Sequence, residues 1–212
     1  MGQEWARIPL PLTPPPSDLA DAADATEIEP PPQIRDLAAA CAQYVQRAVG
    51  TALDGTPETL PLLDHYLRQL GKEPPGPLYE LGMSAAGAYF GEVVRRRFGC
   101  RWIAPENEPF HWRIEFVGVF LHFNPAAAAL EAITAREMGL GASFETTGAD
   151  QEALRQLFES LPPVREQDFY TLSTRLEVLE RVVSELTLLA RARGDRDDWN
   201  ADDYRAALGD EA

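Results

Sequence analysis

The sequence contains few cysteines, and they form no recognisable motif. Cys41 and Cys100 are the only two in 212 residues, and neither belongs to a CxxC pair. A disulfide-stapled scaffold is thereby excluded. Cys41 falls on the apolar stripe of a predicted helix, so we interpret it as a core residue and not as a nucleophile.

Long apolar runs are also missing. No stretch approaches 18 consecutive apolar residues, so the sequence predicts no membrane-spanning helix. The N-terminus, MGQEWARIPL, lacks the basic start and apolar run of a secretory signal peptide. We therefore expect a cytoplasmic protein.

Basic residues are scarce relative to acidic ones, with 19 Lys and Arg against 34 Asp and Glu and a net charge of −15. Proteins that bind nucleic acids or anionic membranes need a basic surface, so neither partner is expected. The charge is compatible with a partner protein that carries basic groups, or with a role in solubility alone. The sequence leaves the oligomeric state open.

Common catalytic and cofactor motifs do not occur. We find no GxSxG, HExxH, GxGxxG or Walker sequence, so no cofactor is expected. With 45% apolar and 25% charged residues, the composition is ordinary for a globular domain that buries a core.

Three regions follow from composition and periodicity. Residues 1–33 hold eight of the 18 prolines and are expected to form a disordered, acidic leader. Residues 34–193 are expected to form a single α+β domain, whose folded part begins near Asp36. Residues 194–212 form an acidic tail with one weak helix that carries Trp199 and Tyr204.

Apolar spacing predicts six helices in the domain. Their expected ranges are 36 to about 50–55, 56–70, 78–98, 125–137, 150–161 and 169–193. The third contains GMSAAGAYFG, whose small residues indicate that another backbone approaches closely. The last has a heptad-like series, which we interpret as packing on the domain itself. That series is Leu172, Leu176, Leu179, Val183, Leu186 and Ala190.

The stretch FHWRIEFVGVFLHFNP, residues 110–125, alternates apolar and polar residues around a glycine and predicts a β-hairpin. With a strand at 101–104, it would give an antiparallel sheet of at least three strands, centred on a hairpin at 109–124 and flanked by helices. One hairpin face is apolar and is expected to face the core. It consists of Phe110, Trp112, Ile114, Phe116, Val119, Leu121 and Phe123.

The other face, which we call the polar hairpin face, is the most specific candidate site. With a turn at Gly118-Val119, Glu115 lies opposite His122 and Arg113 opposite Asn124. A carboxylate beside a histidine suits a general base, and His111 on the same face would complete a two-histidine, one-carboxylate metal site. We favour a solvated face, and a partner-binding surface is the other alternative.

Two further pairs of polar residues lie on predicted helices. Glu92 and Tyr89 are three apart on the small-residue helix and, with Arg113 and Asn124, are candidate partner-binding residues; a nearby arginine is the expected partner of Glu92. Asp64 and His65 are adjacent on a helix and therefore point in different directions. We expect His65 at the surface.

Two segments in tandem, AVGTALDGTPETLPLLDHYL and SAAGAYFGEVVRRRFGCRW, resemble an uncharacterised family of bacterial domains. In that family an LD-x-TPESL…LD helix precedes a GAYLGEVIRR-type helix and a G-x-W strand. The resemblance covers about residues 45–124 and departs at Cys100, where a second glycine is usual. The matching residues are Leu53, Asp54, Thr56, Pro57, Glu58, Leu63, Asp64, Gly87, Tyr89, Gly91, Glu92 and Trp102.

The resemblance implies an α+β fold and a bacterial source, and it brings no established reaction. We therefore expect a non-catalytic binding or accessory protein that acts through protein–protein contacts, antitoxin- or immunity-like by analogy only. The alternative is a small enzyme or metal-binding protein that uses His111, Glu115 and His122.

Overall fold

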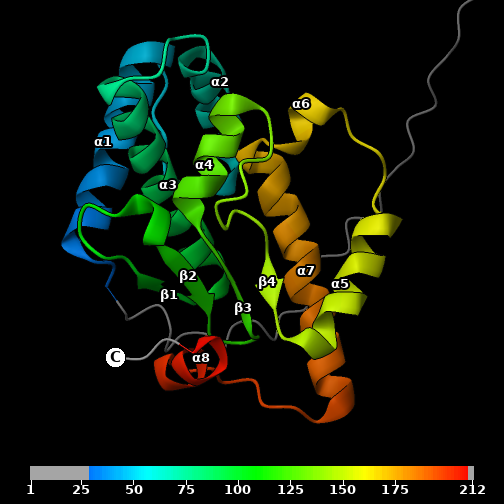
Figure 1. The fold of residues 1–212 in the computed structure, drawn as a ribbon. Coiled ribbons are helices and arrows are strands. Elements are labelled where there is room, and N and C mark those ends of the chain that lie inside the picture. The colour runs from blue at the N-terminus through cyan, green and yellow to red at the C-terminus, as the bar shows by residue number, and fades with distance from the viewer. Residues whose placement is uncertain (1–28, 210–212) are drawn as a thin grey trace, which may run out of the picture.

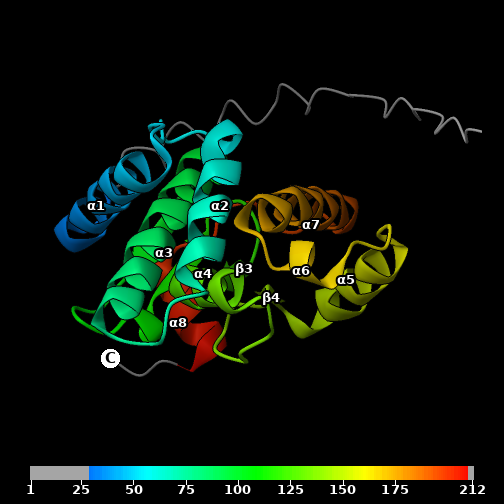
Figure 2. The ribbon, with the colours of Figure 1, turned by 90° about the horizontal axis from the view of Figure 1, so that it is seen from above.

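The fold is α+β, as the sequence predicts. The computed structural model describes residues 29–209, apart from the side chains of residues 166 and 167, so most of the predicted leader lies outside the described residues. A small antiparallel sheet lies between the N-terminal helices and a second group made of α5, α6 and α7 (Figure 1). Seen from above, α1, α3 and α2 lie side by side, with α7 and α5 beyond them (Figure 2).

The N-terminal helices are α1 (Pro32–Val49), α2 (Leu60–Leu70), preceded by the short 3-10 helix η2 (Pro57–Thr59), and α3 (Pro77–Phe98). The first helix begins four residues before the predicted start at Asp36. Proline is tolerated in the first helical turn, where backbone N–H groups have no helical acceptor, so Pro32 starts the helix. The left-handed conformation of Gly50, at φ 81°, ends it.

Helix α3 is the centre of the N-terminal group, and its small residues permit close packing, as predicted. A Cβ atom on Gly87 would lie 2.6 Å from the Cα of Ala126, the second residue of α4 (Pro125–Thr134). A Cβ atom on Gly91 would lie 2.3 Å from the ring of Trp102. Glycine is needed at both positions because a larger side chain would push a helix or an indole away from α3.

The sheet has the strand order β1-β2-β3-β4, with every neighbouring pair antiparallel. The strands are β1 (Cys100–Ile103), β2 (Arg113–Phe116), β3 (Leu121–Phe123) and β4 (Glu145–Thr146). Glu115 pairs with His122, which confirms the predicted register. The last strand lies between the predicted helices 125–137 and 150–161, where no strand is predicted from the sequence.

The apolar hairpin face is buried as predicted, with one exception. Trp112, Ile114, Phe116, Val119, Leu121 and Phe123 all belong to the core. Phe110 is exposed, because it lies in the 3-10 helix η3 (Pro109–His111) that precedes β2. The alternating pattern therefore begins three residues before the strand itself.

The C-terminal half contains α5 (Gly148–Ser160), α6 (Glu166–Phe169), α7 (Leu172–Arg193) and α8 (Ala201–Leu208). α4 ends at Thr134 and not at Glu137, because Ala135 adopts a left-handed conformation with φ 51°. α7 packs on the domain, as expected, although Val182 and not Val183 is the fully buried valine. None of the helices within residues 29–209 combines the length and hydropathy needed to cross a membrane.

Candidate binding pocket

The polar hairpin face is covered by the C-terminal segment, so our preferred interpretation of it as solvated is wrong. Glu115 is 1% exposed and His122 is 7% exposed. The backbone N–H of Trp199 donates to the carbonyl of Val117 at 2.8 Å, and α8 lies across the turn end of the hairpin (Figure 1). The residues that cover this face lie about 80 positions later in the chain, so the periodicity of the hairpin strands cannot reveal them.

The fully buried Tyr204 of α8 holds this cover in place. Its hydroxyl accepts the backbone N–H of Leu121 at 3.0 Å. The same oxygen lies 2.8, 3.1 and 2.9 Å from the carbonyl oxygens of Phe116, Val119 and Leu121, so three acceptors are within reach of its one proton. Its ring stacks on Phe120 at a centroid distance of 4.5 Å.

Arginine side chains compensate the buried carboxylate of Glu115. Oε1 of Glu115 accepts a hydrogen bond from Nε of Arg113 at 2.9 Å, and Oε2 lies 3.7 Å from Nη2 of Arg101. His122 stands opposite, with its Nε2 3.8 Å from Oε2 of Glu145. The buried carboxylate of Glu115 is therefore paired with cations of the domain itself.

His111 is not part of this cluster. It lies on η3 with an exposed side chain, and its Nδ1 is 3.2 Å from Oε2 of Glu108. The hairpin therefore brings together Glu115 and His122, but not His111. Within the part of the chain that the structure describes, no three His, Cys, Asp or Glu side chains are placed to hold a metal ion.

The other candidate partner-binding residues make contacts within the domain. Glu92 is buried and accepts hydrogen bonds from Nε of Arg95 at 2.9 Å and from Nε1 of Trp102 at 2.8 Å, so it has the arginine partner we expected. The hydroxyl of Tyr89 accepts the backbone N–H of Gly55 at 2.7 Å. The side chain of Asn124 accepts the N–H groups of the first turn of α4 and caps that helix.

Asp64 has a structural role that the sequence did not reveal. Its Oδ1 accepts the backbone N–H of Leu172 at 2.7 Å, and its Oδ2 accepts the hydroxyl of Ser173 at 2.6 Å. Burial raises the pKa of Asp64, and these hydrogen bonds oppose that shift. The carboxylate of α2 thus stabilises the start of α7, while His65 is exposed as predicted.

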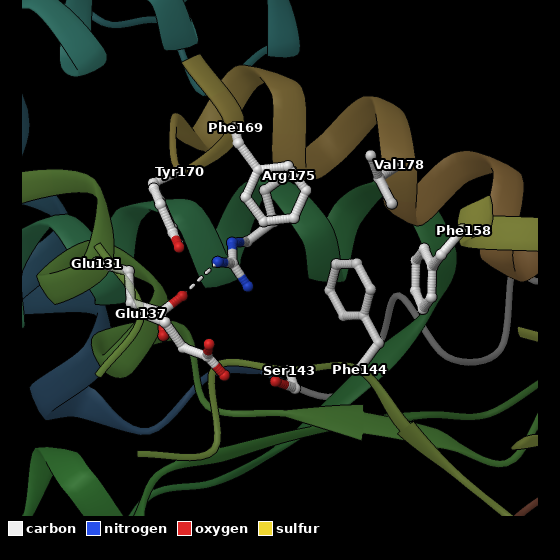
Figure 3. Close-up of a pocket in the computed structure, with 9 residues that line it drawn as sticks. All are labelled: Glu131, Glu137, Ser143, Phe144, Phe158, Phe169, Tyr170, Arg175 and Val178. Atoms are coloured by element: carbon white, nitrogen blue, oxygen red, sulfur yellow. Dashed lines mark hydrogen bonds and ion pairs between the residues drawn. The ribbon is translucent and has the colours of Figure 1, made fainter. Parts of the chain in front are cut away.

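A cavity of about 280 Å³ lies among α4, the loop that follows it, α5, α6 and α7 (Figure 3). We call it the aromatic pocket. Phe158 is 41% exposed and Phe169 is 51% exposed. The pocket is lined by Glu131, Glu137, Ser143, Phe144, Phe158, Phe169, Tyr170, Arg175 and Val178.

A buried ion pair forms one wall of the aromatic pocket. Nη2 of Arg175 donates to Oε2 of Glu131 at 2.6 Å, and Nη1 donates to the carbonyl of Ala142 at 2.5 Å. Burial lowers the pKa of Arg175, and the adjacent Glu131 opposes that shift. Oε1 of Glu131 accepts the N–H of Met138, so the pair also fixes the loop after α4.

Unlike Glu131 and Arg175, the charged residue Glu137 forms no ion pair in the pocket. Its side chain is exposed, and among residues 29–209 no ion pair or hydrogen bond involves its carboxylate. Figure 3 shows the carboxylate extending from the side of Glu131 toward the interior of the cavity. Since Arg175 is matched by Glu131, the pocket has a net charge of one negative unit.

Sequence reasoning missed the aromatic pocket. Its residues come from five segments between 131 and 178, and no local pattern shows that they meet. The predicted helix to Glu137 also placed that residue on a helix, whereas it lies in the loop after α4. The sequence shows phenylalanines on either side of Pro162-Pro163, but only the structure shows that Phe158 and Phe169 are exposed.

Comparison with known proteins found no match among protein-family models, among curated proteins or among solved structures.

Proposed function

We propose that this chain is a non-catalytic binding protein that acts through protein–protein contacts, and that the aromatic pocket is its contact site. The observation that carries the proposal is the exposure of Phe158 and Phe169 at this pocket. Val164, in the loop between their helices, is exposed as well. Neighbouring exposed apolar side chains beside a cavity are typical of interaction surfaces.

The size of the pocket supports this proposal. Pockets that hold small-molecule substrates or cofactors measure roughly 300–1,000 Å³, and the aromatic pocket, at about 280 Å³, lies at the lower edge of that range. It is suited to one inserted side chain. Aromatic side chains at the centre of a contact site contribute much of the binding free energy.

The placement of the chemically reactive groups favours binding over catalysis. An enzyme that used His111, Glu115 and His122 would need these three side chains around one accessible point. Glu115 and His122 are buried under α8, and His111 lies on η3. In the aromatic pocket the charged groups Glu131 and Arg175 are already paired with each other.

A capture experiment with matched variants tests the proposal. The immobilised full chain is exposed to lysate of the source organism, next to the double variant Phe158→Ser/Phe169→Ser and the control Leu188→Ser. Leu188 is an exposed apolar residue of α7 that does not line the pocket. We expect one protein to be retained by the wild type and the control and lost by the double variant. Equal retention by all three would refute a role of the pocket.

A further inference from the structure

We propose that the aromatic pocket receives a basic side chain, an arginine, from the protein partner. This inference rests on the proposed protein-binding function and specifies the chemistry of the bound group. It follows from the aromatic lining of the pocket, from its unmatched charge and from its size.

The lining attracts a cation through its aromatic rings. Phe144, Phe158, Phe169 and Tyr170 surround the cavity (Figure 3). The face of an aromatic ring carries partial negative charge and attracts a cation within about 6 Å of its centroid. Arg175 already makes such a contact, because its Cζ lies 5.9 Å from the centroid of Phe144.

The unpaired negative charge of the pocket favours a ligand group with a positive charge. The guanidinium of Arg175 is compensated by Glu131 at 2.6 Å and donates its other Nη group to the carbonyl of Ala142. Glu137 has no such partner among residues 29–209. Nε of Arg175 makes no hydrogen bond within residues 29–209, but the charge of Arg175 is already compensated by Glu131. A ligand carboxylate would therefore meet Glu137 without an uncompensated cation, whereas a cation would pair with Glu137.

Arginine fits better than lysine. Its guanidinium is planar, stacks on aromatic rings and is more weakly hydrated than an ammonium group, so it loses less on entering a ring-lined cavity. Its planar donors can also reach a carboxylate with two hydrogen bonds. The net charge of −15 further favours a partner surface with basic residues.

A ligand titration of the full chain tests this directly. N-acetyl-arginine amide is compared with N-acetyl-citrulline amide, which has nearly the same shape without the charge, at matched ionic strength. Binding is followed by nuclear magnetic resonance shifts of the Ser143 and Tyr170 amides, up to about 50 mM ligand. We expect saturable shifts with the arginine compound and weaker binding of the citrulline compound.

Two pairs of variants compare the loss of a charge or a ring inside the pocket with the same loss outside it. Glu137→Gln should weaken binding of N-acetyl-arginine amide about two- to fivefold, while Glu106→Gln, which removes the same charge from an exposed loop outside the pocket, should not. Phe169→Leu removes a ring but keeps an apolar side chain and should weaken binding about two- to fivefold. Phe110→Leu, at an exposed phenylalanine outside this pocket, should not.

The outcomes distinguish this inference from the proposed function. Equal affinity for the arginine and citrulline compounds would overturn it, as would the absence of saturable shifts or equal effects of Glu137→Gln and Glu106→Gln. If the Phe158/Phe169 double variant nevertheless loses the captured protein, the pocket is a protein-binding site for a side chain that is not basic.

Discussion

The hydroxyl of Tyr204 accepts the backbone N–H of Leu121 at 3.0 Å, which joins the last helix to the hairpin across 83 positions of sequence. The same hydroxyl lies within hydrogen-bonding distance of three hairpin carbonyl groups. Because Tyr204 is fully buried, no water can replace it without rearrangement. This contact holds α8 over the polar hairpin face.

Tyr204→Phe should therefore lower the free energy of unfolding by about 1–3 kcal/mol, because buried hairpin groups lose their partner. Tyr44→Phe is the matched control, since the hydroxyl of Tyr44, on α1, makes no hydrogen bond within residues 29–209. Urea unfolding of both variants measures the difference. Equal effects would mean that the hydroxyl of Tyr204 does not hold α8 on the sheet.

The apolar hairpin face should be far more sensitive to truncation than His111. Trp112→Ala and Leu121→Ala should each cost roughly 2–5 kcal/mol, because both side chains are buried in the core and leave cavities. His111→Ala should cost well under about 1 kcal/mol, because its side chain is exposed. Denaturant unfolding distinguishes them, and a His111→Ala cost equal to that of Trp112→Ala would contradict the placement of η3.

Stability should fall at alkaline pH because buried acids retain their protons in the folded state. Burial raises the pKa of Cys41 from 9.0 to about 12, and burial also raises the pKa of Tyr204. The unfolded chain loses the thiol proton near pH 9 and the folded chain does not. The stabilising contribution of Cys41 is therefore complete below pH 9 and is lost as the pH rises from 9 toward 12.

Cys41 should account for a loss of about 1.4 kcal/mol for each pH unit within that window. Unfolding measured between neutral pH and pH 11 checks this, and Cys41→Ala should give a flatter curve than the wild type. Identical curves would show that the Cys41 thiol ionises as readily in the folded chain as in the unfolded one.

Association with a partner should depend on ionic strength. The net charge of −15 would steer a basic partner, so the association rate should fall as salt shortens the screening length to about 10 Å near 0.1 M. Surface plasmon resonance with the captured partner at low and near-physiological salt measures this rate. A salt-independent rate, or a partner as acidic as this chain, would mean that the charge serves solubility only.

Local sequence patterns predicted the helices and strands of this fold better than they predicted which segments pack over one another. The alternation around Gly118 correctly placed Glu115 opposite His122, because side chains on strands point to alternate faces. It could not show that Tyr204 covers them, since that contact is set by packing at long range. The helix that carries Tyr204 was expected only as a weak one, although Asn200 and Asp203 form a capping box at its start.

The candidate site was the least predictable part. Arg175 was expected simply on the last long helix, and Glu131 on the helix after the hairpin. Their ion pair joins α7 to α4 across 44 positions, and only the assembled fold brings them together. α6, which contributes Phe169, is too short to have a periodic signal of its own.

The most direct test of the account is a map of where the captured partner contacts this chain. Amide hydrogen exchange of the full chain is measured with and without a saturating amount of partner. We predict slower exchange in residues 157–170, which cover the end of α5, the following loop and α6, and in residues 137–144. Protection confined to α1 and the hairpin, with no change in these two segments, would contradict the assignment of the aromatic pocket as the contact site.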